Sequence, residues 1–142
     1  MPAVVTGVLV QGGAVLLVHR RPDKRVYPDV WDLPGGQVEA GESELQALAR
    51  EMHEELGVHI VAESAARLGV LRAGRGADAV RVGVWLIGAW AGSPANRAPD
   101  EHDDIAWVGI GALGGLSLPH GVLAAARHLP AFERLAVISA LQ

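Results

Sequence analysis

Three glutamates share one face of a predicted helix in the stretch REMHEELG, residues 50–57. Glu51, Glu54 and Glu55 stand at positions i, i+3 and i+4, where helical side chains are neighbours and like charges repel by about 0.2–0.5 kcal/mol per pair. Two interpretations fit this octet. One is a solvated acidic surface. The other is a site for a divalent cation, because hard ions such as Mg²⁺ bind carboxylate oxygens.

A helix must position these carboxylates, and its signals are present. Ser43 followed by Gln46 fits a capping box, and Gly57 is a typical C-terminal stop because glycine adopts the left-handed conformation at little cost. Apolar residues at helical spacing predict a buried stripe of Leu45, Leu48, Ala49, Met52 and Leu56. The acidic face lies beside this stripe, so the carboxylates can face a cleft.

The remaining segments predict strands around this helix. Residues 4–11 and 14–20 form a hairpin with a Gly-Gly turn. Residues 21–42 are rich in Pro, Gly and Asp, and their length predicts a functional loop. Further strand-like segments cover residues 58–63, 67–72, 80–90 and 104–110. The tail from His120 onward predicts two short helices broken at Pro130.

Length and composition fit one globular domain, residues 1–142. Half of the residues are apolar and the net charge is −4, which favours neither a disordered chain, nor a membrane protein, nor a binder of nucleic-acid polymers. The longest apolar run, residues 82–92, is too short to cross a bilayer. The absence of cysteine and of a basic signal-peptide region predicts a cytoplasmic protein. Strands with helices on both sides predict an α/β sandwich around a mixed sheet.

The octet ends a longer pattern. Gly36 and Glu42 are separated by five residues, and seven more precede RE-Met-x-EE-x-G-Val at residues 50–58. This resembles the Nudix hydrolase signature G-x5-E-x7-R-E-U-x-E-E-x-G-U, in which U is a bulky aliphatic residue. Every defining position is filled, and a chance match in one window is on the order of 10⁻⁹ at background residue frequencies. The resemblance therefore favours the cation site over the solvated surface.

Other segments resemble the MutT-like branch of this family. They are WDLPGG at residues 31–36, the hairpin that ends in Arg20-Arg21, and Glu101 placed six residues before Trp107. The likeness covers residues 4 to about 128. It implies a Nudix-type α/β/α sandwich with a mixed β-sheet.

The resemblance also implies a metal centre for Mg²⁺ or Mn²⁺. Its ligands would be Glu51, Glu54, Glu55 and the backbone carbonyl of Gly35, a residue type that lets the backbone approach closely.

Further roles follow from the same resemblance. Arg50 would orient a catalytic glutamate, and Glu42 would pair with Arg50 in a structural role, as would the glycines Gly36 and Gly57. The general base stays open between Glu54, Glu51 and the distal Glu101, with the signature glutamates favoured.

Substrate contacts are predicted at three residues. Arg21 is the candidate for the phosphates, and Tyr27 and Trp31 could stack on a base. The other tryptophans, Trp85, Trp90 and Trp107, are expected in the core. The six histidines show no zinc spacing and are assigned no ligand role.

Several Nudix branches lack their markers here. No proline stands about 15 residues past the signature, as in the ADP-ribose branch, and the only tyrosine, Tyr27, precedes the signature, unlike in the dinucleoside polyphosphate branch. The asparagine often found before the C-terminal helix in enzymes for oxidised dGTP is replaced by Pro119-His120.

The expected activity is therefore a (deoxy)nucleoside triphosphate pyrophosphohydrolase that acts on a small nucleotide. The alternatives are a hydrolase of nucleoside-diphosphate sugars or other capped diphosphates, and a non-catalytic nucleotide-binding module. No membrane or nucleic-acid polymer is expected as a partner, and the resemblance makes a homodimer plausible.

Overall fold

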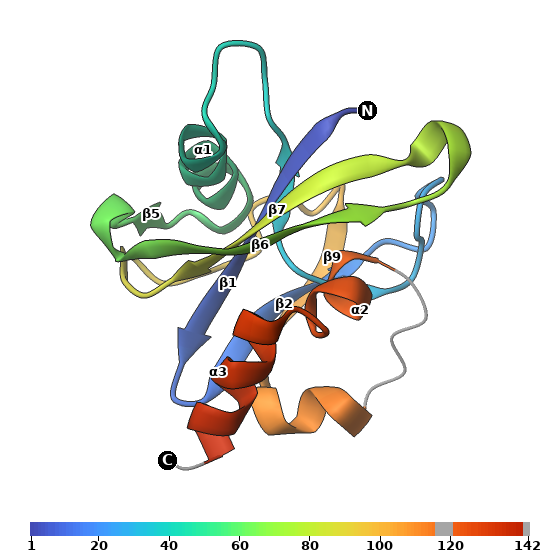
Figure 1. Ribbon diagram of the computed structural model, residues 1–142. Coiled ribbons are helices and arrows are strands. Elements are labelled where there is room, and N and C mark those ends of the chain that lie inside the picture. Colours follow the sequence, from blue (N-terminus) through green and yellow to red (C-terminus); the bar gives the residue numbers. More distant parts are fainter. Residues whose placement is uncertain (116–120, 141–142) are drawn as a thin grey trace.

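A seven-stranded mixed sheet forms the centre of the structure, a computed structural model that describes residues 1–115 and 121–140 (Figure 1). The order is β3-β2-β1-β7-β6, and β4 pairs with β1 while β9 pairs with β2. The strands are β1 (Ala3–Gln11), β2 (Ala14–Arg20), β3 (Trp31–Asp32), β4 (Gly35–Gln37), β6 (Ala65–Ala73), β7 (Val80–Ile87) and β9 (His102–Gly109). β1 and β7 run parallel and the other pairs antiparallel. A separate antiparallel pair joins β5 (His59–Ile60) to β8 (Trp90–Ala91).

Helices cover both faces of the sheet. Helix α1 (Glu44–Leu56) packs on one face, and α2 (Val122–Ala126) and α3 (Pro130–Ala140) lie on the other (Figure 1). Short 3₁₀ turns are η1 (Ala62–Ser64), η2 (Gly76–Asp78) and η3 (Ile110–Gly115). The predicted α/β sandwich with a mixed sheet is confirmed. No helix in residues 1–115 or 121–140 is long and apolar enough to cross a membrane.

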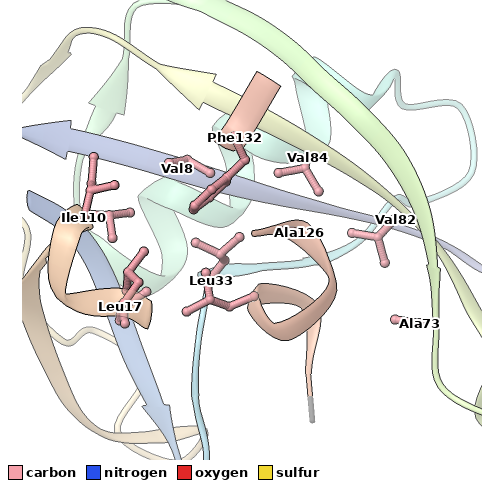
Figure 2. Packing of buried hydrophobic residues seen from close by; sticks show 12 residues of the cluster. Val8, Leu17, Leu33, Ala73, Val82, Val84, Ile110, Ala126 and Phe132 are labelled. Atoms are coloured by element: carbon pink, nitrogen blue, oxygen red, sulfur yellow. The ribbon is translucent and has the colours of Figure 1, made fainter. Parts of the chain in front are cut away.

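Two apolar layers hold the sheet between the helices. Beneath α1, strand residues such as Val5 and Leu9 contact Leu48 and Met52 of the helix. The second layer packs α2, α3 and η3 on the opposite face (Figure 2). Its members include Val8, Leu17, Leu33, Val82, Val84, Ile110, Leu123, Ala126 and Phe132. β1 therefore contributes to both layers and is mostly apolar, as expected for a strand buried on both faces.

Local signals fix the first hairpin and the ends of α1. Gly12 and Gly13 have φ angles of 59° and 76°, which the two-residue turn requires. The capping box joins Ser43 and Gln46 in both directions, and Gly57 ends α1 at φ 72°. These predictions are confirmed.

Several boundaries differ from the predictions because pairing partners decide them. The segment 21–42 contains β3 and β4, which form because β2 and β1 offer them partners. The predicted strand 58–63 shortens to β5 and continues as η1. The predicted strand 80–90 breaks between β7 and β8. There the backbone N–H groups of Gly88 and Ala89 donate hydrogen bonds to Ser64.

Some predicted core positions are wrong. On α1, Ala47 is buried and Ala49 is exposed, because the helix is rotated so that Glu55 also faces inward. Trp107 is 40% exposed and stacks on Trp90 with ring centroids 6.1 Å apart. The predicted tail helices are present, but Pro130 begins α3, where its missing N–H costs nothing. Pro119 and His120 lie outside the described residues.

Candidate active site

Arg50 ties the loop before α1 to the acidic face of the helix. Its guanidinium donates from Nε and Nη2 to the two carboxylate oxygens of Glu42, at 2.8 and 2.9 Å. Nη1 donates to Glu51 Oε1 at 2.9 Å and lies 3.4 Å from Glu54 Oε2, and Nη2 also donates to the carbonyl oxygen of Gln37. A bidentate arginine–carboxylate pair fixes orientation as well as charge. Arg50 therefore holds Glu51 in one position.

Gly36 leaves the space that the Glu51 carboxylate fills. A β-carbon at position 36 would lie 2.4 Å from Glu51 Oε1, too close for any other residue type without displacement of that carboxylate. At Gly35 a β-carbon would lie 2.0 Å from the carbonyl oxygen of Val5. Both glycines therefore serve close approach: Gly35 to the backbone of β1, and Gly36 to a functional side chain.

Glu55 is the buried carboxylate of the group. Its side chain is 4% exposed, and neither of its oxygens has a hydrogen-bond partner among the described residues. Burial, with the negative charges of Glu51 and Glu101, raises the pKa of Glu55 to about 9, although the backbone of Gly35 acts in the opposite direction. An unpartnered buried carboxylate is costly unless a proton or a cation joins it. The site therefore fits a divalent cation.

Glu101, which precedes β9, and His102, its first residue, complete this group. Glu55, Glu101 and His102 each offer a ligand atom, and these atoms lie within 4.8 Å of one another. His102 is buried, and its burial lowers the pKa of the imidazole, which is therefore neutral near pH 7 and keeps a nitrogen lone pair. Glu101 is exposed and reaches the group from the loop before the strand.

The three glutamates of α1 differ in their surroundings. Glu51 is largely buried, and burial raises its pKa while Arg50 opposes the increase. Glu54 has a side chain that is 57% exposed and makes one long contact with Arg50. The helix thus presents one carboxylate that is fixed, one that reaches solvent and one, Glu55, that is enclosed.

A pocket of about 220 Å³ is lined in part by the two glycines. Apolar walls come from Val4, Val26, Leu33, Ala73, Val80 and Val122, and polar groups come from Thr6, Arg20, Tyr27, Asp32 and Asp78. Thr6 is 3% exposed, and its hydroxyl has no partner among the described residues. Small-molecule sites commonly combine apolar walls with a few such polar groups. Gly35 and Gly36 also line this pocket, so it adjoins the carboxylates.

Tyr27 stands at the boundary of this pocket. It also lines a second hollow of about 390 Å³ with Arg25, Arg75 and Asp78. Its φ of 48° lies in the left-handed region that residues other than glycine seldom adopt. Such positions cluster at functional sites because the surrounding structure must impose them.

Asp32 joins the pocket to α2. Its carboxylate accepts the backbone N–H groups of Leu33, Val122 and Leu123 at 2.8, 2.9 and 2.7 Å. Burial raises the pKa of Asp32, while these three donors act in the opposite direction. Gly121 leaves the space for this contact, because a β-carbon there would lie 2.4 Å from Asp32 Oδ2. Asp32 therefore fixes the wall of the pocket that α2 provides.

Two predicted substrate residues lie elsewhere. The Arg21 guanidinium is engaged by Asp23 at 3.0 and 3.1 Å and by the carbonyl of Pro99. The Trp31 ring lies 5.0 Å from the ring of His19 and lines a separate hollow. Of the three predicted substrate residues, Tyr27 is the one that lines the pocket beside Gly35 and Gly36.

Thr6, Asp32 and His102 were missed as site residues from the sequence. Thr6 is a single polar residue inside an apolar strand, and that exception to the pattern is the signal that could have found it. Asp32 and His102 adjoin residues that the sequence singles out, but their contacts with Leu123 and Glu55 join segments far apart in sequence and could not be predicted from a local pattern.

The structure thus combines an α/β/α sandwich with a group of carboxylates that could hold a metal ion and with a pocket beside Gly36. The NUDIX domain family model matches residues 1–132. The chain therefore belongs to the NUDIX domain family, and its fold is that of the MutT-like members.

Solved structures support this assignment over most of the chain. A MutT NUDIX hydrolase from Burkholderia pseudomallei has a TM-score of 0.75 and 28% identity, and the match covers 93% of this chain and 95% of that one. The E. coli ORF135 protein has a TM-score of 0.75 and 25% identity, with coverage of 97% and 92%.

Curated relatives match over a shorter stretch. A Mycobacterium tuberculosis protein provisionally named 8-oxo-dGTP diphosphatase 2 is 50% identical over 58 residues, which is 40% of each chain. The CTP pyrophosphohydrolase of Escherichia coli K12 is 41% identical over 58 residues, 41% of this chain and 42% of that one. The matches thus span about 40% of the length of these curated relatives.

Proposed function

We propose that this chain is a divalent-metal-dependent pyrophosphohydrolase that converts (deoxy)nucleoside triphosphates into nucleoside monophosphates and pyrophosphate. One observation carries the proposal: Gly35 and Gly36 line the pocket, and on their other contacts Gly36 borders the Glu51 carboxylate while the backbone of Gly35 acts on Glu55. A nucleoside in the pocket would extend its phosphates across these glycines toward Glu51 and Glu55. The names of relatives support this substrate class, since they refer to hydrolysis of 8-oxo-dGTP and CTP.

The carboxylates need a cation for this chemistry. Glu51, Glu54, Glu55 and Glu101, with the carbonyl of Gly35, would hold Mg²⁺ or Mn²⁺, which suit oxygen ligands. When bound, such an ion supplies a counter-charge for the phosphate oxygens and acidifies water. Without a cation, the ionised carboxylates of this group would instead repel the substrate.

The side chains of the protein have distinct tasks in this proposal. Arg50 keeps Glu51 in place through its contact at 2.9 Å. Glu54 acts as the general base, because its exposed carboxylate can reach water and is held by a single long contact. Glu42 anchors Arg50 and takes no part in proton transfer.

The pocket would bind the nucleoside. Tyr27 at its edge can stack on the base, and the buried Thr6 hydroxyl can form a hydrogen bond with a base or sugar atom. Arg20, which lines the same pocket, is better placed than Arg21 to meet a negative substrate group. A hydroxyl left unpartnered in the free protein favours ligands that complete it.

A second candidate substrate class is favoured by the hollow lined by Arg25, Tyr27 and Arg75. It shares Val26, Tyr27 and Asp78 with the pocket, so a second group attached to a diphosphate would have a place there. Nucleoside-diphosphate sugars and other capped diphosphates would use it, with the same carboxylates.

The experiment is a product analysis over a nucleotide panel with Mg²⁺, with Mn²⁺ and with chelator. The panel contains canonical and oxidised deoxynucleoside triphosphates, nucleoside-diphosphate sugars and dinucleoside polyphosphates. We expect pyrophosphate release from triphosphates that stops when the metal is removed. Turnover of capped diphosphates alone would assign the protein to the second substrate class in place of the triphosphates. Nucleotide binding without any turnover would instead identify a nucleotide-binding module.

A further inference from the structure

One buried histidine beside the carboxylates has no task in the proposed reaction. The His102 side chain is 7% exposed, and its Nδ1 has no hydrogen-bond partner among the described residues. Its Nε2 lies 3.7 Å from Glu55 Oε1. Burying a polar group without a partner costs free energy, for an imidazole nitrogen as for the Glu55 oxygens. Two neighbouring buried side chains on different chain segments thus each carry a polar atom without a hydrogen-bond partner among the described residues.

The spacing of these groups suits a shared ion better than a hydrogen bond. A hydrogen bond between Nε2 and Oε1 would need about 2.7–3.2 Å, so 3.7 Å is too long for one. Adjacent ligand atoms on an octahedral ion lie about 3 Å apart, because each metal–ligand distance is about 2.0–2.2 Å. The ligand atoms of Glu55, Glu101 and His102 all lie within 4.8 Å of one another. A small side-chain adjustment would therefore bring them onto one ion.

We propose that His102 is a nitrogen ligand of the divalent cation that Glu55 and Glu101 hold. This assignment rests on the metal site of the proposed function and adds a nitrogen donor to an oxygen set. Imidazole favours later transition metals such as Co²⁺ over Mg²⁺, which prefers oxygen ligands. His102 therefore biases the metal preference of this chain toward transition metals.

Pulsed electron paramagnetic resonance of the Mn²⁺-loaded protein tests the assignment without substrate or turnover. An imidazole nitrogen bound to Mn²⁺ modulates the electron spin echo. We expect this modulation in the wild-type protein and its loss in His102→Gln. His53→Gln is the matched control, because His53 is exposed on α1 outside the group. Modulation that survives His102→Gln, or that is absent from the wild type, overturns the assignment.

Calorimetric titrations with Mg²⁺, Mn²⁺ and Co²⁺ give a second readout. We expect His102→Gln to raise the Kd for Co²⁺ by about tenfold or more, and the Kd for Mg²⁺ by less than about threefold. Equal weakening for all three ions would make His102 a positioning residue and overturn the ligand role. If the wild-type protein binds the cation but shows no nitrogen modulation, only the ligand role of His102 is overturned. If the wild-type protein binds no cation in the calorimetric titrations, the proposed function is overturned as well.

Discussion

The carboxylate of Glu51 occupies the space that a side chain at Gly36 would fill, with Oε1 2.4 Å from the position of a β-carbon there. This relationship couples the second glycine of WDLPGG to the geometry of the metal site. Gly36→Ala should displace Glu51 and lower kcat by on the order of 10²-fold, since a displacement of about 1 Å can have that effect. Turnover of the purified variant and its melting temperature are the measurements. Wild-type kcat in Gly36→Ala would contradict the coupling.

Gly35→Ala should act differently from Gly36→Ala. Its β-carbon would meet the Val5 carbonyl oxygen at 2.0 Å. We therefore expect a large decrease in the melting temperature, measured by thermal unfolding, rather than a stably folded protein with low activity. A stable Gly35→Ala variant would show that β1 and β4 can separate more easily than their contact indicates.

Glu42→Gln should lower stability more than catalysis. Its two hydrogen bonds from Arg50, with that positive charge, hold the pKa of Glu42 at about 2, below its ordinary value of about 4.3. A lowered pKa in the folded state stabilises the protein above the unfolded pKa, and that stabilisation is lost as pH falls toward about 2. The difference in melting temperature between wild type and Glu42→Gln should therefore shrink from about pH 6 to about pH 3. A difference that is independent of pH would argue against the ion pair.

Glu55→Gln should stabilise the metal-free protein while abolishing turnover. The folded-state pKa of about 9 exceeds the ordinary value of about 4.3, so the folded protein keeps a proton that the unfolded chain releases. Stability in chelator should then fall as pH rises between these values, and Glu55→Gln should remove that fall. Melting curves in chelator from about pH 6 to about pH 9 measure it. If the melting temperatures of the two proteins change with pH in parallel, the raised pKa of Glu55 is disproved.

Thr6→Val should weaken substrate binding without loss of stability. The hydroxyl is buried and has no partner in the described part of the chain, so its replacement by a methyl group removes an unsatisfied polar atom. We expect KM to rise about five- to tenfold, the effect of roughly one hydrogen bond, with an equal or higher melting temperature. Thr6→Ser keeps the hydroxyl and serves as the control. An unchanged KM in Thr6→Val would remove Thr6 from the substrate site.

Asp32→Ala should loosen α2 and the pocket together. Loss of an acceptor for the N–H groups of Val122 and Leu123 should lower stability by about 1–3 kcal/mol and raise KM, since Val122 lines the pocket. Gly121→Ala perturbs the same contact from the helix side and should act in the same direction. Denaturant unfolding and steady-state kinetics measure both effects. A variant with lower stability and unchanged KM would confine Asp32 to the fold.

The helix and its glutamates could be predicted from the sequence because the signals are local. The Ser43–Gln46 capping box and Gly57 set the ends of α1 within the chain segment itself. The burial of each glutamate could not be predicted in this way. Glu54 and Glu55 are adjacent, yet one is exposed and the other enclosed, because the packing of α1 against β1 and β4 decides which side faces inward.

The remaining site residues depend on contacts between distant segments. His102 was assigned no ligand role because the six histidines show no zinc spacing with each other, and because its neighbour Glu55 lies on a different element, α1. Asp32 lies within WDLPGG, but two of its three hydrogen-bond donors, Val122 and Leu123, are in α2. Trp31 was predicted to meet a base from its residue type alone, and its ring contact with His19, which the pairing of β3 with β2 produces, could not be predicted from that residue type.

The most direct test of the proposed function is the rate of pyrophosphate release by Glu54→Gln, measured with saturating Mg²⁺ on the best triphosphate of the panel. Glu63→Gln is the matched control. Glu63 is exposed on η1, so this substitution makes the same chemical change outside the site. We expect Glu63→Gln to keep the wild-type rate and Glu54→Gln to lose at least about 10²-fold while remaining folded. A Glu54→Gln rate close to that of Glu63→Gln would contradict the proposed role of the acidic face of α1.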